Sequence, residues 1–183
     1  MSLFIPDYYS SDLTTVDWSC FYARGIRATF FDLDNTLELQ GTILPGPRSR
    51  CIIQRCRAAQ IEPVLVSNAR SARGRQFAET LGIAYLGSAG KPFPGKLMAL
   101  LREMDLRPES GLMVGDQVFT DLLVARFSGM PAMLQRPLPG QEAWYVRLKR
   151  ALEAFLRFLG QDPRRAPAAP CCAGDCDEKG GEA

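Results

Sequence analysis

The pattern of apolar and polar positions between residues 26 and 136 predicts alternating strands and helices. Short apolar runs, expected to be strands, occur at residues 28–32, 62–68, 83–87, 111–116 and 131–135. Longer segments with apolar residues at helical spacing separate them, at residues 48–60, 72–81, 94–104 and 120–129. Strands buried on both faces need apolar residues at successive positions. The pattern therefore predicts an α/β fold, with helices on both faces of a parallel sheet.

The pattern changes at both ends of this region, and this change sets the expected domain organisation. Residues 1–25 combine aromatic and acidic side chains; packing on or beside the domain is favoured over an amphipathic surface that meets another chain or a membrane. Residues 141–159 are expected to form a helix that is apolar nearly all round and covers a sheet edge or meets a partner. Residues 161–183 are rich in Pro, Ala, Gly and charge, which predicts a disordered tail. The domain itself is expected over residues 26–160.

Composition narrows the classes of function. The chain has 183 residues, of which 46% are hydrophobic, and a net charge of +2, so we expect one domain and no nucleic-acid partner. No apolar run reaches the roughly 20 residues that span a bilayer, and no signal-peptide pattern is present, so a cytoplasmic protein is expected. The absence of histidine excludes imidazole bases and histidine zinc sites. Any catalysis must use carboxylates, lysine, hydroxyls or a metal.

Polar side chains stand at the ends of the predicted strands, where an open α/β sheet binds its ligands. Asp32 and Asp34 follow the first strand. The acids that would share one pocket are Asp32, Asp34, Asp116 and Asp121. These carboxylates would repel each other unless a cation were bound, and carboxylate oxygens suit Mg²⁺, which is usually shared with a substrate phosphate. The sequence therefore predicts a Mg²⁺ site and a phosphorylated substrate.

The spacing of Asp32 and Asp34 suits phosphoryl transfer. One carboxylate can attack phosphorus to give an aspartyl-phosphate, while a second protonates the leaving oxygen and later deprotonates water. Both side chains can reach one phosphoryl group if Leu33 between them points back into the protein. Neutral and cationic groups are then needed around the phosphate oxygens, where charge develops. The candidates for this phosphate-binding role are Thr36, Ser67, Asn68 and Lys91.

The motifs DLDNTL, VLVSN, GKP and GDQVFTD, in this order, resemble the haloacid dehalogenase (HAD) superfamily of aspartate-based phosphatases over about residues 26–136. The FIPDYY segment and the GDQ…TD motif are most similar to its subclass IIIA, the YqeG type. The resemblance implies a Rossmann-like fold, with Asp32 as the nucleophile and Asp34 as the acid/base. It also implies Mg²⁺ held by the Asp32 side chain, the Asp34 backbone carbonyl and Asp116. Asp121 would support this metal site without being one of these three direct ligands.

Some local assignments have alternatives. Lys91 is favoured over Lys96 as the phosphate-binding lysine because it begins the Lys-Pro dipeptide of the motif. Asp121 could instead cap the helix that follows it. Ala69 stands where a second polar residue is expected, which could change contacts with the substrate. The basic segment 70–75 could contact an anionic substrate or form an ordinary solvated helix face.

The spacing between motifs leaves no room for a cap domain. Only about 27 residues separate Leu37 from Val64, and 24 separate Ser67 from Lys91. Such an open site could be closed by a large substrate, by a neighbouring subunit in a homo-oligomer, or by the N-terminal segment.

The resembled family includes relatives that act on phosphatidylglycerophosphate. A Mg²⁺-dependent phosphatase of a membrane lipid head group, in peripheral contact with the membrane, is therefore the leading hypothesis. A soluble sugar-phosphate or nucleotide phosphatase is the first alternative. A catalytically idle adaptor with the same fold is the second.

Overall fold

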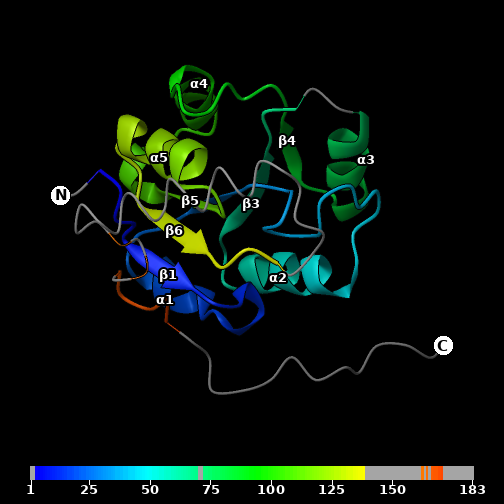
Figure 1. The fold of residues 1–183 in the computed structure, drawn as a ribbon, viewed down its shortest axis with the longest axis horizontal. Coiled ribbons are helices and arrows are strands. Elements are labelled where there is room, and N and C mark those ends of the chain that lie inside the picture. The colour runs from blue at the N-terminus through cyan, green and yellow to red at the C-terminus, as the bar shows by residue number, and fades with distance from the viewer. Residues whose placement is uncertain (1–2, 70–71, 139–161, 163, 165, 171–183) are drawn as a thin grey trace.

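The structure is a computed structural model that describes residues 3–69, 72–138, 162, 164 and 166–170 (Figure 1). The helix expected at 141–159 lies outside the described residues. The strands are β1 (Tyr8–Ser10), β2 (Ala28–Phe31), β3 (Glu62–Val66), β4 (Ala84–Leu86), β5 (Gly111–Gly115) and β6 (Ala132–Gln135). The helices are α1 (Trp18–Ala23), α2 (Pro47–Ala58), α3 (Ala72–Leu81), α4 (Gly95–Glu103) and α5 (Leu123–Ser128). Shorter turns are η1 (Leu13–Thr15), η2 (Pro108–Ser110) and the π-helical η3 (Val118–Leu122).

All six strands form one parallel sheet in the order β1-β6-β5-β2-β3-β4. The central strand β2 pairs with β3 and β5, and Phe31 lies opposite both Leu65 and Val114. Because the strands are parallel, their carboxyl ends meet at the same edge of the sheet. The predicted parallel α/β fold is confirmed, and the five predicted strands correspond to β2 through β6.

Helices cover both faces of the sheet, because successive strand residues point to opposite sides. Phe31 and Leu65 belong to one core cluster, together with buried residues of α1, α2 and α3. Phe30 and Val64 belong to a second cluster, together with buried residues of α4 and α5. In Figure 1, α4 and α5 accordingly lie above the sheet, and α1 and α2 lie below it. Within the described residues no separate cap domain is present.

The N-terminal segment is part of this core. Its strand β1 pairs with β6 and extends the sheet by one edge strand. Leu13, Val16 and Phe21 are fully buried, and the Trp18 ring packs edge-on against Phe31 with 5.7 Å between the ring centroids. The described part of residues 1–25 thus pairs with β6 and packs its apolar side chains into the core.

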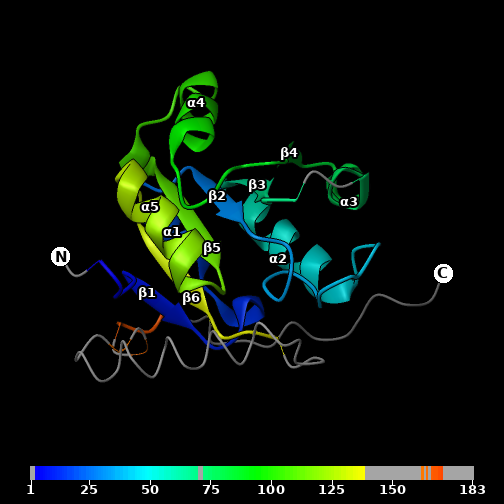
Figure 2. The ribbon, with the colours of Figure 1, turned by 45° about the horizontal axis from the view of Figure 1, so that its top comes forward.

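Part of the predicted tail lies against the outer side of β1. The backbone N–H of Tyr9 donates to the Pro167 carbonyl at 2.8 Å, and the N–H of Ala169 donates to the Tyr9 carbonyl at 2.8 Å. The views agree on this, since the orange trace follows β1 in both Figure 1 and Figure 2. Residues 166–170 are thus held by pairing with an otherwise open strand edge, which the tail's composition does not signal. The boundaries of the domain stay a prediction.

Candidate active site

The carboxyl ends of β2, β3 and β5 bring several of the predicted site residues together. Asp32 follows β2 directly, and its backbone N–H donates to the Val114 carbonyl of β5 at 2.9 Å. Asp116 is the first residue after β5, and Ser67 is the first after β3. The apolar strands therefore end at neighbouring points, and the first polar residue after each strand enters the same region.

Three aspartates and one lysine form a buried cluster there. The side chains of Asp32, Asp116 and Asp121 offer carboxylate oxygens that all lie within 4.8 Å of one another. Lys91 Nζ donates to Asp32 Oδ1 and to Asp121 Oδ1, both at 2.6 Å, and to the Val66 carbonyl at 3.3 Å. Each of these four charged residues is at most 7% exposed.

Burial and mutual repulsion dominate the electrostatics of this cluster. Burial raises the pKa of Asp32 to about 7; Lys91 opposes this rise, whereas Asp121 and Asp116 add to it. Burial alone would lower the pKa of Lys91, but the carboxylates of Asp121 and Asp32 raise it above its ordinary value. Lys91 is therefore a fixed cation, and its single positive charge stands against three buried carboxyl groups.

Asp121 reaches the cluster because of two local features. It lies inside the π-helical turn η3, where the sequence predicted the start of a regular helix at residue 120. Gly115 at the end of β5 leaves room for it, since a Cβ at Gly115 would overlap the Asp121 carboxyl group. The second oxygen, Asp121 Oδ2, accepts from the Gln117 N–H at 3.1 Å. The Asp121 carboxylate thus lies in the buried cluster and contacts Lys91; π-turns of this kind often occur at functional sites.

Asp34 lies outside the buried cluster, and its side chain is 26% exposed. Both of its carboxylate oxygens accept from Arg73 Nη2, at distances of 2.8 and 2.6 Å. Its Oδ1 also accepts from the Gly41 N–H at 3.3 Å. The structure therefore places the second aspartate of the motif at the rim of the site, paired with an arginine of α3.

The motif at residues 67–68 supports the position of Lys91. The Asn68 side chain accepts from the Lys91 N–H at 2.7 Å and donates to the Lys91 carbonyl at 2.9 Å, so it fixes the backbone of the lysine loop. Ser67 is buried, and its Oγ accepts from the Ala69 N–H at 3.2 Å. Lys96 is directed elsewhere, with Nζ donating to the Ser88 carbonyl at 2.5 Å. Of these two lysines, Lys91 is the one that contacts the buried aspartates.

Thr36 follows Asp34 by two positions and is fully buried. Its Oγ1 has no hydrogen-bond partner among the described residues. A buried hydroxyl normally finds such a partner. Thr36 thus has a buried oxygen that is available for hydrogen bonding.

Sequence reasoning missed two residues that shape the site. Arg73 lies within the basic segment 70–75, but nothing in the sequence distinguishes it from Arg75, which is exposed on the same helix. Gly115 precedes Asp116 in the motif, and only the approach of Asp121 shows why a side chain is excluded there. The role of Arg73 depends on a contact with Asp34, which is distant in the chain. The role of Gly115 depends on the position of Asp121 in the turn that follows it.

Comparisons with known proteins show which families the chain is similar to. The profile of a family described as HAD-hydrolase-like matches residues 88–136. The chain is 27% identical over 150 residues to the Bacillus subtilis protein named "Probable phosphatase YqeG", covering 82% of this chain and 87% of that one. Among solved structures, a Legionella pneumophila protein assigned to the HAD subfamily III A hydrolases matches with a TM-score of 0.51 and 19% identity, over 66% of this chain and 71% of that one. The chain is therefore HAD-like.

This HAD-like protein is a phosphatase, and it is similar to the YqeG type. A second relative is phosphatidylglycerophosphate phosphatase 1, chloroplastic/mitochondrial, of Arabidopsis thaliana, which is 27% identical over 162 residues and is matched by 83% of this chain. The chain spans about half of that longer protein, namely 47% of it.

The buried carboxylates of the HAD site fit a small, hard divalent cation. Asp32, Asp116 and Asp121 supply oxygen atoms close enough to share one ion, and oxygen ligands are those that such cations prefer. One lysine cannot balance three buried carboxylates, so a cation at this point would remove an electrostatic cost. The donor set is thus suited to a metal of the kind that assists phosphoryl transfer.

Replacing Gly115 with alanine is expected to displace Asp121 from the site. The added methyl group would overlap the Asp121 carboxyl, and forcing an extra group into a packed region costs about 1–3 kcal/mol of stability. We expect the rate of phosphate release to fall by about 100-fold, because a small misplacement of a catalytic site has effects of that order. Gly95→Ala in α4 is the matched control, since nothing lies within 4 Å of a Cβ there. Equal activity in the two variants would contradict the role given to Gly115.

Proposed function

We propose that this HAD phosphatase hydrolyses a phosphomonoester through an aspartyl-phosphate on Asp32, with Mg²⁺ as its cofactor. One observation carries the proposal: Asp32 lies at the end of the central strand, within a buried cluster of three carboxylates whose only close cation among the described residues is Lys91. Such a cluster is costly to bury and is suited to holding a phosphoryl group and a metal ion together.

In this proposal each side chain has a defined task. Asp32 attacks phosphorus while the bond to the leaving oxygen breaks, and Asp34 protonates that oxygen. Asp34 then takes a proton from the water that hydrolyses the aspartyl-phosphate. The Asp32, Asp116 and Asp121 carboxylates and the Asp34 backbone carbonyl would hold Mg²⁺, which when bound neutralises charge on the phosphate oxygens.

Neutral and cationic groups complete the phosphate pocket. Lys91 Nζ, 2.6 Å from Asp32 Oδ1, is placed to neutralise an oxygen of the group that Asp32 attacks. The hydroxyls of Ser67 and Thr36 are the proposed hydrogen-bond donors to the phosphate. Asn68 contributes indirectly, because both ends of its amide hold the backbone of Lys91.

We further propose that the substrate is amphiphilic, with phosphatidylglycerophosphate as the lead candidate, as the name of the Arabidopsis relative suggests. Large apolar side chains are exposed on the two loops that carry site residues. Ile43 (58% exposed) and Leu44 (55%) follow Asp34, and Phe93 (75%) follows Lys91. Exposed apolar groups at the rim of a polar site are suited to acyl chains or a lipid surface. Within the described residues no helix is long and apolar enough to cross a membrane.

Phosphate release from a substrate panel tests the proposed function. The panel contains an aryl phosphate, sugar phosphates, nucleotides and phosphatidylglycerophosphate in mixed micelles, each with Mg²⁺ or with a chelator. We expect release that requires Mg²⁺ and is fastest with the lipid. Faster turnover of a sugar phosphate or a nucleotide would replace the lipid proposal with that of a soluble phosphatase. A folded protein that released no phosphate from any substrate would contradict the proposed function.

The exposed apolar side chains are expected to affect turnover of lipid and not of soluble substrates. Burying one such side chain is favourable by about 1.5–3 kcal/mol, so a variant with Ile43→Asn and Leu44→Asn should lose about tenfold or more in kcat/KM on vesicles containing phosphatidylglycerophosphate. Its kcat/KM for a soluble aryl phosphate should stay within about twofold. Phe127→Ser is the control, because Phe127 is 51% exposed on α5, which carries no site residue. If the control lost lipid turnover equally, the rim would have no special role.

A further inference from the structure

Arg73 links helix α3 to the loop that carries Asp34. Its Nη2 donates to both carboxylate oxygens of Asp34, at 2.8 and 2.6 Å, and its Nη1 donates to the Thr42 carbonyl at 2.9 Å. The two side chains are 22% and 26% exposed, so the pair lies at the rim and not in the buried cluster. Arg73 is thus a cation at the entrance of the site whose present partner is the proposed acid/base.

This pairing holds Asp34 away from the reaction that it is proposed to assist. Both Asp34 oxygens are engaged with a guanidinium group, whereas proton transfer requires one of them to reach the leaving oxygen of the substrate. A guanidinium group recognises carboxylate and phosphate with the same planar geometry. An anionic group of a substrate can therefore take the place of Asp34 on Arg73.

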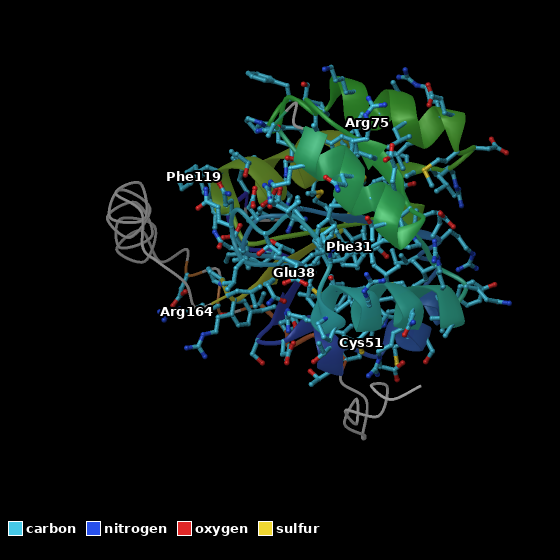
Figure 3. The ribbon with its side chains drawn as sticks, turned by 90° about the vertical axis from the view of Figure 1, so that its right-hand side faces the viewer. Phe31, Glu38, Cys51, Arg75, Phe119 and Arg164 are labelled. Atoms are coloured by element: carbon cyan, nitrogen blue, oxygen red, sulfur yellow. The ribbon has the colours of Figure 1, made fainter. Side chains whose placement is uncertain are left out.

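The loop that carries Asp34 has an anchor that does not involve Arg73. Glu38 Oε1 accepts from the Gly46 N–H and from Ser49 Oγ, both at 2.8 Å, and so ties the loop to the start of α2. Figure 3 shows Glu38 between α2, which carries Cys51, and α3, which carries Arg75. Arg73 can exchange its partner while this anchor keeps the loop in place.

We propose that Arg73 determines specificity by exchanging Asp34 for a second anionic group of the substrate, which frees Asp34 for the reaction. This rests on the proposed function. The substrate class is a phosphomonoester with a phosphodiester one glycerol unit away, as in the head group of phosphatidylglycerophosphate. A substrate without the second phosphate leaves Arg73 on Asp34 and is turned over more slowly. The exchange makes or breaks no covalent bond.

Two soluble substrates isolate this effect from any contact with lipid. Glycerol 3-phosphate and glycerophosphoglycerophosphate, the deacylated head group, have the same kind of leaving group and differ in the second phosphate. We expect the wild-type protein to prefer the latter by about tenfold or more in kcat/KM, the size typical of a charge-assisted contact. Arg73→Met should reduce this preference to about onefold and raise turnover of glycerol 3-phosphate, because Asp34 is no longer held by the guanidinium group. Arg73→Lys should keep part of the preference, because lysine retains the positive charge but lacks the planar, paired N–H donors of the guanidinium group.

Arg75→Met is the matched control, since Arg75 is exposed on the same helix, and it should keep the wild-type preference. Loss of a partly exposed ion pair has little effect on folding, so all variants should unfold near the wild-type temperature. An active wild-type protein without the preference would overturn this inference alone. An Arg73→Met protein equally slowed on both substrates would also overturn it, by showing that Arg73 only positions Asp34. A wild-type protein that cleaved neither these esters nor an aryl phosphate would overturn the proposed function, and this inference with it.

Discussion

Asp32→Asn is expected to abolish phosphate release, with kcat reduced by about 10⁴-fold or more, because an amide cannot attack phosphorus in place of a carboxylate. The side chain keeps its size in a site that is at most 7% exposed, so the variant should remain folded. Its kcat is measured by continuous phosphate detection with saturating Mg²⁺ and an aryl phosphate, and its folding by circular dichroism and thermal unfolding.

Asp105→Asn makes the same chemical change at an exposed position and serves as the control. Asp105 has φ of 53°, a conformation that asparagine also adopts readily. The Asp105→Asn variant should retain wild-type activity. If Asp32→Asn kept more than about one per cent of wild-type activity, a difference far smaller than removal of a nucleophile causes, Asp32 would not be the nucleophile.

Lys91→Met is expected to inactivate the protein and to destabilise its metal-free form. The change leaves the carboxylates of Asp32 and Asp121 buried without the cation that contacts both at 2.6 Å. Removing one partner of a buried ion pair costs about 3–5 kcal/mol of unfolding free energy. A divalent cation bound to the same carboxylates should restore part of this loss, so Mg²⁺ should raise the Tm of the variant more than that of the wild-type protein.

The comparison uses thermal unfolding with a chelator and with Mg²⁺, alongside phosphate release. Lys96→Met is the control, because Lys96 bonds only to the Ser88 carbonyl on the surface among the described contacts. It should leave both Tm and activity near the wild-type values. If Lys91→Met unfolded at the wild-type temperature in the chelator, the buried charges would not be coupled in the way described.

Much of the fold follows from the sequence because the central strands are continuous apolar runs. β2, β3 and β5 are buried along almost their whole lengths, so the continuous apolar runs in the sequence locate these strands. β1 gives no such signal, since it has three residues and exists through pairing with β6 and with residues 167–169. Its two tyrosines and one serine form no continuous apolar run, so the sequence alone does not mark it as a strand.

The site was predictable where it depends on strand ends and unpredictable where it depends on distant contacts. Asp32 and Asp116 follow buried strands, and this places them together as soon as the sheet is parallel. The separation of Asp34 from the cluster depends on Arg73, which is 39 positions away in the chain. The entry of Asp121 depends on a π-turn, and one extra residue in a helical turn leaves no mark on the apolar pattern.

Trapping the covalent intermediate tests the central claim most directly. The wild-type protein is mixed with Mg²⁺ and an aryl phosphate, quenched during turnover and treated with borohydride, which reduces an aspartyl-phosphate to homoserine. Peptide mass spectrometry then locates the reduced residue. We predict reduction at Asp32, and only when both Mg²⁺ and substrate are present. Reduction at another carboxylate such as Asp34 or Asp116, or an active protein with no reduced residue, would contradict a mechanism in which Asp32 carries the phosphoryl group.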